Sequence, residues 1–258
     1  MTQWLASARR TPCAVLLAVQ LLGIVVYPLL GDQPAGRAAF SIFALLVLVV
    51  AVMAVRMTPA LSWVAVGIGI PVVVLTILEV IHPDNDALVL WSAVSHALFY
   101  CYTAYALIRY MFSDDVVTAD EVWATGATFT VVAWAFAYMY AATQVVWPGS
   151  FTAAVAADEA RTWTELLFLS VTTLTSTGLS DIVPVRPQAR SIVMLEQIAG
   201  MLYLALVVAR IIALLSARAA RKTVESEEAT VEASTWEPPA AETVAEQVAA
   251  TDPTEPTA

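Results

Sequence analysis

The sequence predicts an all-α membrane protein with six transmembrane helices and a re-entrant helix between the last two. Of its 258 residues, 60% are apolar and 13% are charged, and the mean hydropathy is +0.76. A soluble domain of this size cannot cover so much apolar surface with polar groups, so lipid must be the outer solvent. A helix needs about 20 apolar residues to cross the hydrocarbon core. Six runs have roughly that length: 12–30, 38–55, 60–81, 87–112, 122–147 and 189–216.

The distribution of basic residues predicts the orientation of these spans. The first run has 19 apolar residues behind Arg9 and Arg10, which is long for a cleaved signal peptide, so we expect a retained helix. With the amino terminus inside, seven bases lie on the cytoplasmic side and four on the outer side, as the positive-inside rule requires. We therefore expect a multi-pass protein of the plasma membrane with both termini in the cytoplasm.

Most of the net charge of −10 comes from the carboxyl-terminal segment. Residues 223–258 contain nine acids and no Lys or Arg, whereas residues 1–222 contain 13 acids and 12 bases. This composition is typical of a disordered cytoplasmic tail, and it does not indicate a partner. Cys13 and Cys101 lie in apolar runs and predict buried side chains, with neither a disulfide nor a metal site.

A shorter apolar segment lies between the last two spans. Thr162 and Glu165 have capping-box spacing, which predicts a helix over 162–174 that is too short to cross the membrane. A polar loop with one glycine follows it, over residues 175–184. Irregular backbone at membrane depth is tolerated only where protein buries it or where it lines water. The pattern favours a re-entrant segment, and a surface helix between two spans is the alternative.

The order of these features resembles the pore module of potassium channels. That family has the motif Thr-Thr-Val-Gly-Tyr-Gly-Asp after a short pore helix, and residues 175–181 align with it. Val171-Thr172-Thr173-Leu174 before the motif is also similar to the family, and Gly200 lies 19 residues after Asp181, where the family often has a hinge glycine. The resemblance covers residues 122–216.

The resemblance implies an ion channel subunit for passive conduction of monovalent cations, with potassium as the first candidate. The pore helix directs the negative end of its dipole into the membrane, and loop carbonyls replace the water shell of the ion. One loop cannot surround an ion, so a homotetramer in the lipid bilayer is implied, with permeant cations as the only ligands and no other cofactor. The implied filter residues are Thr175, Ser176, Thr177, Gly178, Leu179, Ser180 and Asp181. Support of the filter, or gating, is implied for Thr172, Glu196 and Gly200.

Three filter positions depart from the family motif, at Thr177, Leu179 and Ser180. The family has a left-handed glycine where this chain has Ser180, and left-handed backbone costs an L-residue about 1–2 kcal/mol. A potassium-selective pore, a less selective monovalent cation pore and a non-conducting membrane interaction protein therefore all remain open.

The remaining regions are an amino-terminal four-helix region (1–112), a cytoplasmic linker (113–121) and the pore module (122–222). A voltage-sensing helix needs Arg or Lys at every third position, and the fourth span has one base, Arg109, so we do not expect gating by this mechanism. Within the same span, His96 has either a packing or a proton-sensing role. The sequence contains no motif for nucleotide binding, nucleic-acid binding or catalysis, so we do not expect an enzyme.

Overall fold

The computed structural model describes residues 11–30, 34–56, 62–113 and 119–235. Linker residues 114–118 and tail residues 236–258 therefore lie outside the described residues. The helices and the two short strands are α2 (Pro12–Leu30), α3 (Pro34–Arg56), α4 (Ser62–Ile81), α5 (Asp86–Met111), α6 (Ala119–Val146), β1 (Phe151–Thr152), α7 (Trp163–Leu174), β2 (Val183–Pro184) and α8 (Pro187–Thr235).

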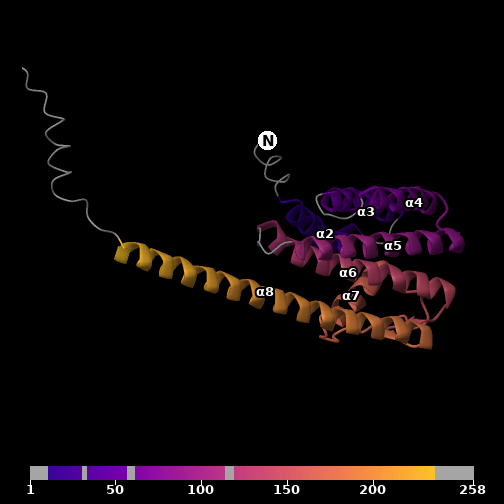
Figure 1. Ribbon diagram of the computed structural model, residues 1–258. Coiled ribbons are helices and arrows are strands. Elements are labelled where there is room, and N and C mark those ends of the chain that lie inside the picture. The colour runs from indigo at the N-terminus through magenta and orange to yellow at the C-terminus, as the bar shows by residue number, and fades with distance from the viewer. Residues whose placement is uncertain (1–10, 31–33, 57–61, 114–118, 236–258) are drawn as a thin grey trace, which may run out of the picture. The chain divides into compact units, whose positions relative to one another are not determined.

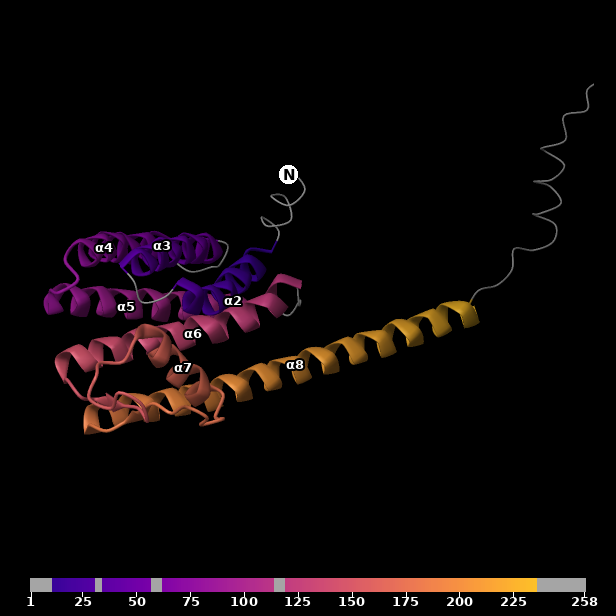
Figure 2. The ribbon, with the colours of Figure 1, turned by 180° about the vertical axis from the view of Figure 1, so that it is seen from behind.

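Two compact units make up the chain, residues 1–210 and residues 211–258. In the first unit α5 and α6 form an antiparallel pair, with α3 and α4 on one side and α7 on the other (Figures 1 and 2). Helix α2 packs against both α3 and α6. The paired strands β1 and β2 join the loops on either side of α7, with Phe151 opposite Pro184.

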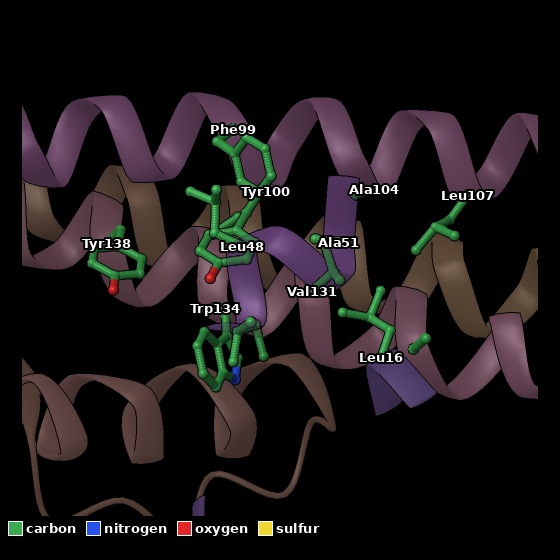
Figure 3. Close-up of a cluster of buried hydrophobic side chains, with 14 of the residues drawn as sticks. Leu16, Leu48, Ala51, Phe99, Tyr100, Ala104, Leu107, Val131, Trp134 and Tyr138 are labelled. Atoms are coloured by element: carbon green, nitrogen blue, oxygen red, sulfur yellow. The ribbon is translucent and has the colours of Figure 1, made fainter. Parts of the chain in front are cut away.

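Aromatic side chains of α5 and α6 form the centre of the main hydrophobic core (Figure 3). Tyr100 of α5 makes an edge contact with Trp134 of α6, with ring centroids 5.7 Å apart. His96 stacks on Tyr138 at 4.3 Å and its Nδ1 lies 2.9 Å from the carbonyl oxygen of Ser92, so Nδ1 donates a hydrogen bond. His96 therefore takes part in packing, and its proton-sensing role stays a prediction.

Four helices in the described part of the chain are long and apolar enough to cross a membrane: Trp63–Ile81, Asp86–Met111, Asp120–Val146 and Pro187–Arg210. Shorter apolar stretches are described within α2 and α3, so the total of six spans stays a prediction. The expected fold class, an all-α membrane protein, is confirmed.

Helix α8 is longer than the inner helix predicted at 189–216, because it continues to Thr235. The prediction of disorder from residue 223 is therefore wrong for residues 223–235. Residues 216–235 are rich in Ala, Arg, Lys and Glu, which have high helix propensity, so their composition favours continuation of the helix. The acidity of the segment led to the error.

Candidate functional site

The short helix α7 begins with a complete capping box. The Thr162 hydroxyl accepts a hydrogen bond from the Glu165 N–H at 3.4 Å, and the Glu165 carboxylate accepts one from the Thr162 N–H at 2.7 Å. These bonds satisfy amide donors that the first turn of a helix leaves free. The capping box therefore holds the amino terminus of α7 in place, directly after a structured loop.

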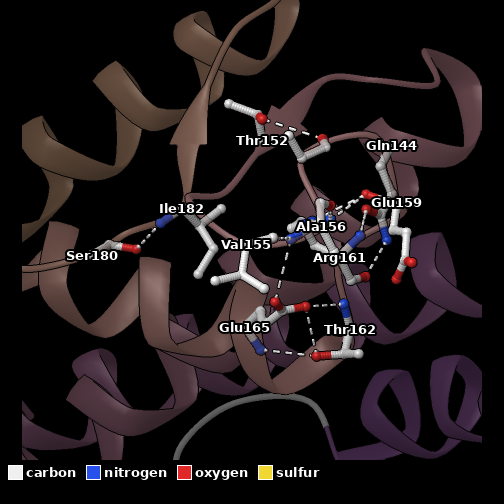
Figure 4. A network of polar contacts seen from close by, with 11 residues as sticks. Gln144, Thr152, Val155, Ala156, Glu159, Arg161, Thr162, Glu165, Ser180 and Ile182 are labelled. Carbon is white, nitrogen blue, oxygen red and sulfur yellow. Dashed lines mark hydrogen bonds and ion pairs between the residues drawn. The ribbon is translucent and has the colours of Figure 1, made fainter.

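The loop before α7 is organised around one buried cation, Arg161 (Figure 4). Its guanidinium donates to the carbonyl oxygens of Glu159, at 2.6 Å, and Val155, at 3.3 Å, and pairs with Glu165 at 3.5 Å. The Gln144 side chain of α6 also forms two hydrogen bonds with the backbone of Arg161, at 2.8 and 3.0 Å. The start of α7 is thereby tied to the end of α6.

A tight turn follows α7, centred on the carbonyl oxygen of Thr172. This oxygen accepts hydrogen bonds from the N–H groups of Thr177, at 3.0 Å, and Gly178, at 3.1 Å. It also accepts one from the Thr177 hydroxyl, at 3.2 Å, and the Thr175 and Thr177 hydroxyl oxygens lie 3.0 Å apart. The turn therefore folds back onto the last turn of α7.

The two amide bonds to Thr172 fix the direction of two other carbonyls. In a trans peptide the C=O points away from the N–H of the same plane, and the described chain contains no cis peptide bond. The carbonyls of Ser176 and Thr177 share their planes with the N–H groups that point at Thr172. They therefore point away from α7, as a cation-binding loop requires.

The predicted filter is largely exposed in the single chain. Residues 176–179 and Asp181 are exposed, and Leu179 is 78% exposed. Within the described residues, no hydrogen bond ends at a carbonyl oxygen of residues 175–180. A row of unsatisfied backbone acceptors next to membrane-spanning helices needs partners from outside the chain.

Two filter residues adopt left-handed backbone, and they differ from the expected one. Ser176 has φ +59° and Gly178 has φ +65°. Ser180 is absent from the described residues with positive φ, so the expected left-handed strain at Ser180 is wrong. The Ser180 hydroxyl oxygen instead accepts a hydrogen bond from the Ile182 N–H at 3.1 Å, a turn geometry that glycine cannot supply (Figure 4).

Behind the turn, Glu196 of α8 joins three helices. Its carboxyl group forms hydrogen bonds with the Ser170 hydroxyl of α7 and the Tyr140 hydroxyl of α6. Glu196 is fully buried, and Ser170 also donates to the carbonyl oxygen of Ala133 at 2.8 Å. The structure thus brings Glu196 to α7, where the predicted support role requires it.

Gly200 lies one turn further along α8, against the end of α7. A Cβ at this position would clash with the carbonyl oxygen of Leu174 and lie 3.1 Å from its carbonyl carbon and Cα. The absence of a side chain therefore permits close approach of two backbones. The hinge function that the resemblance implies stays a prediction, because α8 is continuous here.

At the other end of the transmembrane part of α8, Arg210 pairs with Glu121 of α6 at 3.0 Å. The guanidinium also lies over the ring of Phe112, 4.9 Å from its centroid. The neighbouring Asp120 accepts hydrogen bonds from the Cys13 N–H of α2, at 3.1 Å, and from the Tyr110 hydroxyl, at 3.4 Å. These contacts connect α8 to the accessory helices.

Three residues with these contacts were not predicted from the sequence: Arg210, Tyr140 and Ser170. Arg210 could have been predicted from the sequence, because an ionisable residue inside an apolar run is a functional candidate by default. Tyr140 and Ser170 could not have been predicted, since tyrosine and serine are common residues in such helices. Only the packing of α6, α7 and α8 brings these two hydroxyls to one carboxyl group.

Comparison with known proteins identifies the family. The family model for ion channels matches residues 87–217, just over half of the chain. The chain belongs to the ion channel family. The matched region begins in α5, includes α6, α7 and the loop that follows α7, and ends in α8. No curated protein and no solved structure matches the chain. The resemblance to the potassium-channel-type pore module is thereby confirmed.

Proposed function

We propose that four copies of this channel subunit surround one central axis and conduct monovalent cations passively, with potassium preferred over sodium. The loop formed by residues 175–181 of each subunit is the selectivity filter. Each subunit contributes one α7 helix, and the negative ends of the four helix dipoles converge on the axis and favour a cation there. The pore lies in the plasma membrane, with both termini in the cytoplasm.

The unsatisfied carbonyls of residues 175–180 carry this proposal. A dehydrated cation is a suitable partner for backbone oxygens that no donor of the described chain satisfies. One loop supplies such oxygens from one side only, so the ion needs loops from further subunits. Fourfold assembly places the Ser176 and Thr177 carbonyls as two successive rings around the ion.

The outer part of the filter holds the ion less tightly. Leu179 replaces the aromatic residue of the family motif, and Ser180 bonds to its own turn instead of adopting left-handed backbone. We assign ion dehydration to the rings at Ser176 and Thr177 and a hydrated ion to the level of Leu179. Fewer dehydrating rings discriminate less between potassium and sodium, so the preference is expected to be moderate.

Ion flux into liposomes that contain the purified protein tests the proposal. The wild-type channel should pass potassium faster than sodium and should exclude chloride. Gly178→Ala should abolish the flux, because the filter needs φ +65° at this position. Gly149→Ala is the matched control, since Gly149 also has positive φ (+74°) and open space around it but lies in the outer loop. This control should conduct like the wild type.

Two results would contradict the proposal. If the protein were a monomer in mild detergent, it could not form the central axis that the proposal requires. A stable tetramer that passes neither potassium nor sodium would instead support a non-conducting membrane interaction protein.

A further inference from the structure

The junction of Tyr140, Ser170 and Glu196 contains more hydrogen-bond acceptors than an ionised glutamate allows. The Ser170 oxygen lies within hydrogen-bond distance of two oxygens, the carbonyl of Ala133 at 2.8 Å and the carboxyl group of Glu196. A serine hydroxyl has one proton and can donate only once. The carbonyl of Ala133 has no proton to give. One of the two contacts therefore needs a proton from Glu196.

A protonated Glu196 satisfies every contact at this junction. Its Oε1–H donates to the Ser170 oxygen, the Ser170 hydroxyl donates to the carbonyl of Ala133, and the Tyr140 hydroxyl donates to Oε2. With an ionised Glu196, Ser170 would face two acceptors with one proton. The Ser170 oxygen would then contact one of these two acceptor oxygens with no proton between them, which is unfavourable in a buried site.

The surroundings of Glu196 also favour the neutral form. Tyr140 packs in an apolar cluster beside this carboxyl group, with Phe151, Leu166, Leu169, Ile182, Ala189 and Val193. The ion pairs found in the described part of the chain join Arg161 to Glu165 and Arg210 to Glu121, so neither reaches Glu196. A buried charge without a counterion is costly.

We infer that Glu196 is held as a neutral carboxylic acid, which acts as a positioning residue by donating its proton to Ser170 and fixing α7 behind the filter. This inference rests on the proposed conducting function and assigns a protonation state to the predicted support role of Glu196. Ser170 lies one turn before Leu174, whose backbone packs against Gly200. The donated proton therefore holds the filter end of α7 in register with α8.

Loss of this proton would weaken the junction. At alkaline pH an ionised Glu196 leaves Ser170 unable to bond both α6 and α8, so α7 loosens and the filter loses its geometry. Tyr140 is the titratable group that faces Glu196 from α6. The charged residue of α7, Glu165, bonds to Thr162 and Arg161, and α8 contributes Arg190, which bonds to the carbonyl of Pro184. Conduction should therefore fall as pH rises.

Infrared spectroscopy and flux on the purified full-length channel test this inference. Glu196→Gln keeps the same bonds, because its amide N–H donates to Ser170 and its amide oxygen accepts from Tyr140, but it cannot lose a proton. We expect it to conduct like the wild type at neutral pH and to keep its flux at alkaline pH. Glu196→Ala should lose flux at every pH. Glu159→Gln is the matched control, since Glu159 is exposed in the outer loop, and it should keep the alkaline loss.

The infrared spectrum reports protonation separately from conduction. The wild type and Glu159→Gln should show a carboxylic acid carbonyl band at neutral pH that is absent in Glu196→Gln. Wild-type spectra without this band, or a Glu196→Gln channel as impaired as Glu196→Ala, would overturn the inference while leaving the conducting function intact. A wild type that shows the band but no flux would instead count against the proposed function alone.

Discussion

Replacing Gly200 by alanine should destabilise the channel through a direct backbone clash. The added Cβ would overlap the carbonyl oxygen of Leu174 and lie 3.1 Å from the adjacent carbonyl carbon. The Leu174 atoms belong to the backbone and cannot rotate away from the new methyl group. Helix α7 must therefore shift relative to α8. Overpacking of this kind costs about 1–3 kcal/mol, and a tetramer has four such sites. The gain in helix propensity, at most about 1 kcal/mol, offsets part of that cost.

Thermal denaturation in detergent, followed by loss of the folded oligomer on size-exclusion chromatography, measures this effect. Two glycines of α4 provide controls for helix propensity without a clash. A Cβ at Gly67 has nothing within 4 Å, and one at Gly69 meets only side-chain atoms at ordinary distances, the nearest at 3.7 Å. Gly67→Ala and Gly69→Ala should be neutral or stabilising. A Gly200→Ala channel as stable as these controls would refute the close approach of α7 and α8.

Two further changes test the inner end of α8 and the filter. Arg210→Gln should lower the free energy of unfolding by about 3–5 kcal/mol, because the buried Glu121 carboxylate, whose side chain is only 5% exposed, loses this ion pair. The double exchange Arg210→Glu with Glu121→Arg should recover part of this loss in the same thermal assay, and no recovery would argue against the pair. Ser176→Gly should remove the cost of left-handed backbone for an L-residue, about 1–2 kcal/mol. The greater flexibility of glycine in the unfolded chain offsets about 0.5–1 kcal/mol of this gain. A net gain in stability is expected, and a loss would mean that the Ser176 side chain itself holds the turn.

Much of this architecture follows from apolar length and spacing. The ends of α4, α5 and α6 lie within three residues of the runs read from the sequence, because lipid imposes both length and composition on a spanning helix. The capping box of Thr162 and Glu165 is a local interaction, which is why it could be read directly from spacing.

Features that depend on contacts between distant helices could not be read in this way. The bonds of Glu196 to Tyr140 and Ser170 span 56 and 26 residues, and no local pattern encodes them. The left-handed residue of the filter was misplaced at Ser180 for a related reason. A motif assigns backbone by analogy, whereas here the hydrogen bonds to Thr172 decide the turn.

The most direct test of the central claim is an anomalous diffraction map of the purified channel grown with rubidium, which substitutes for potassium. The account predicts a fourfold assembly with anomalous peaks on its axis, at the level of the Ser176 and Thr177 carbonyl oxygens. An axis without peaks, or a filter loop that faces lipid away from any symmetry axis, would contradict it.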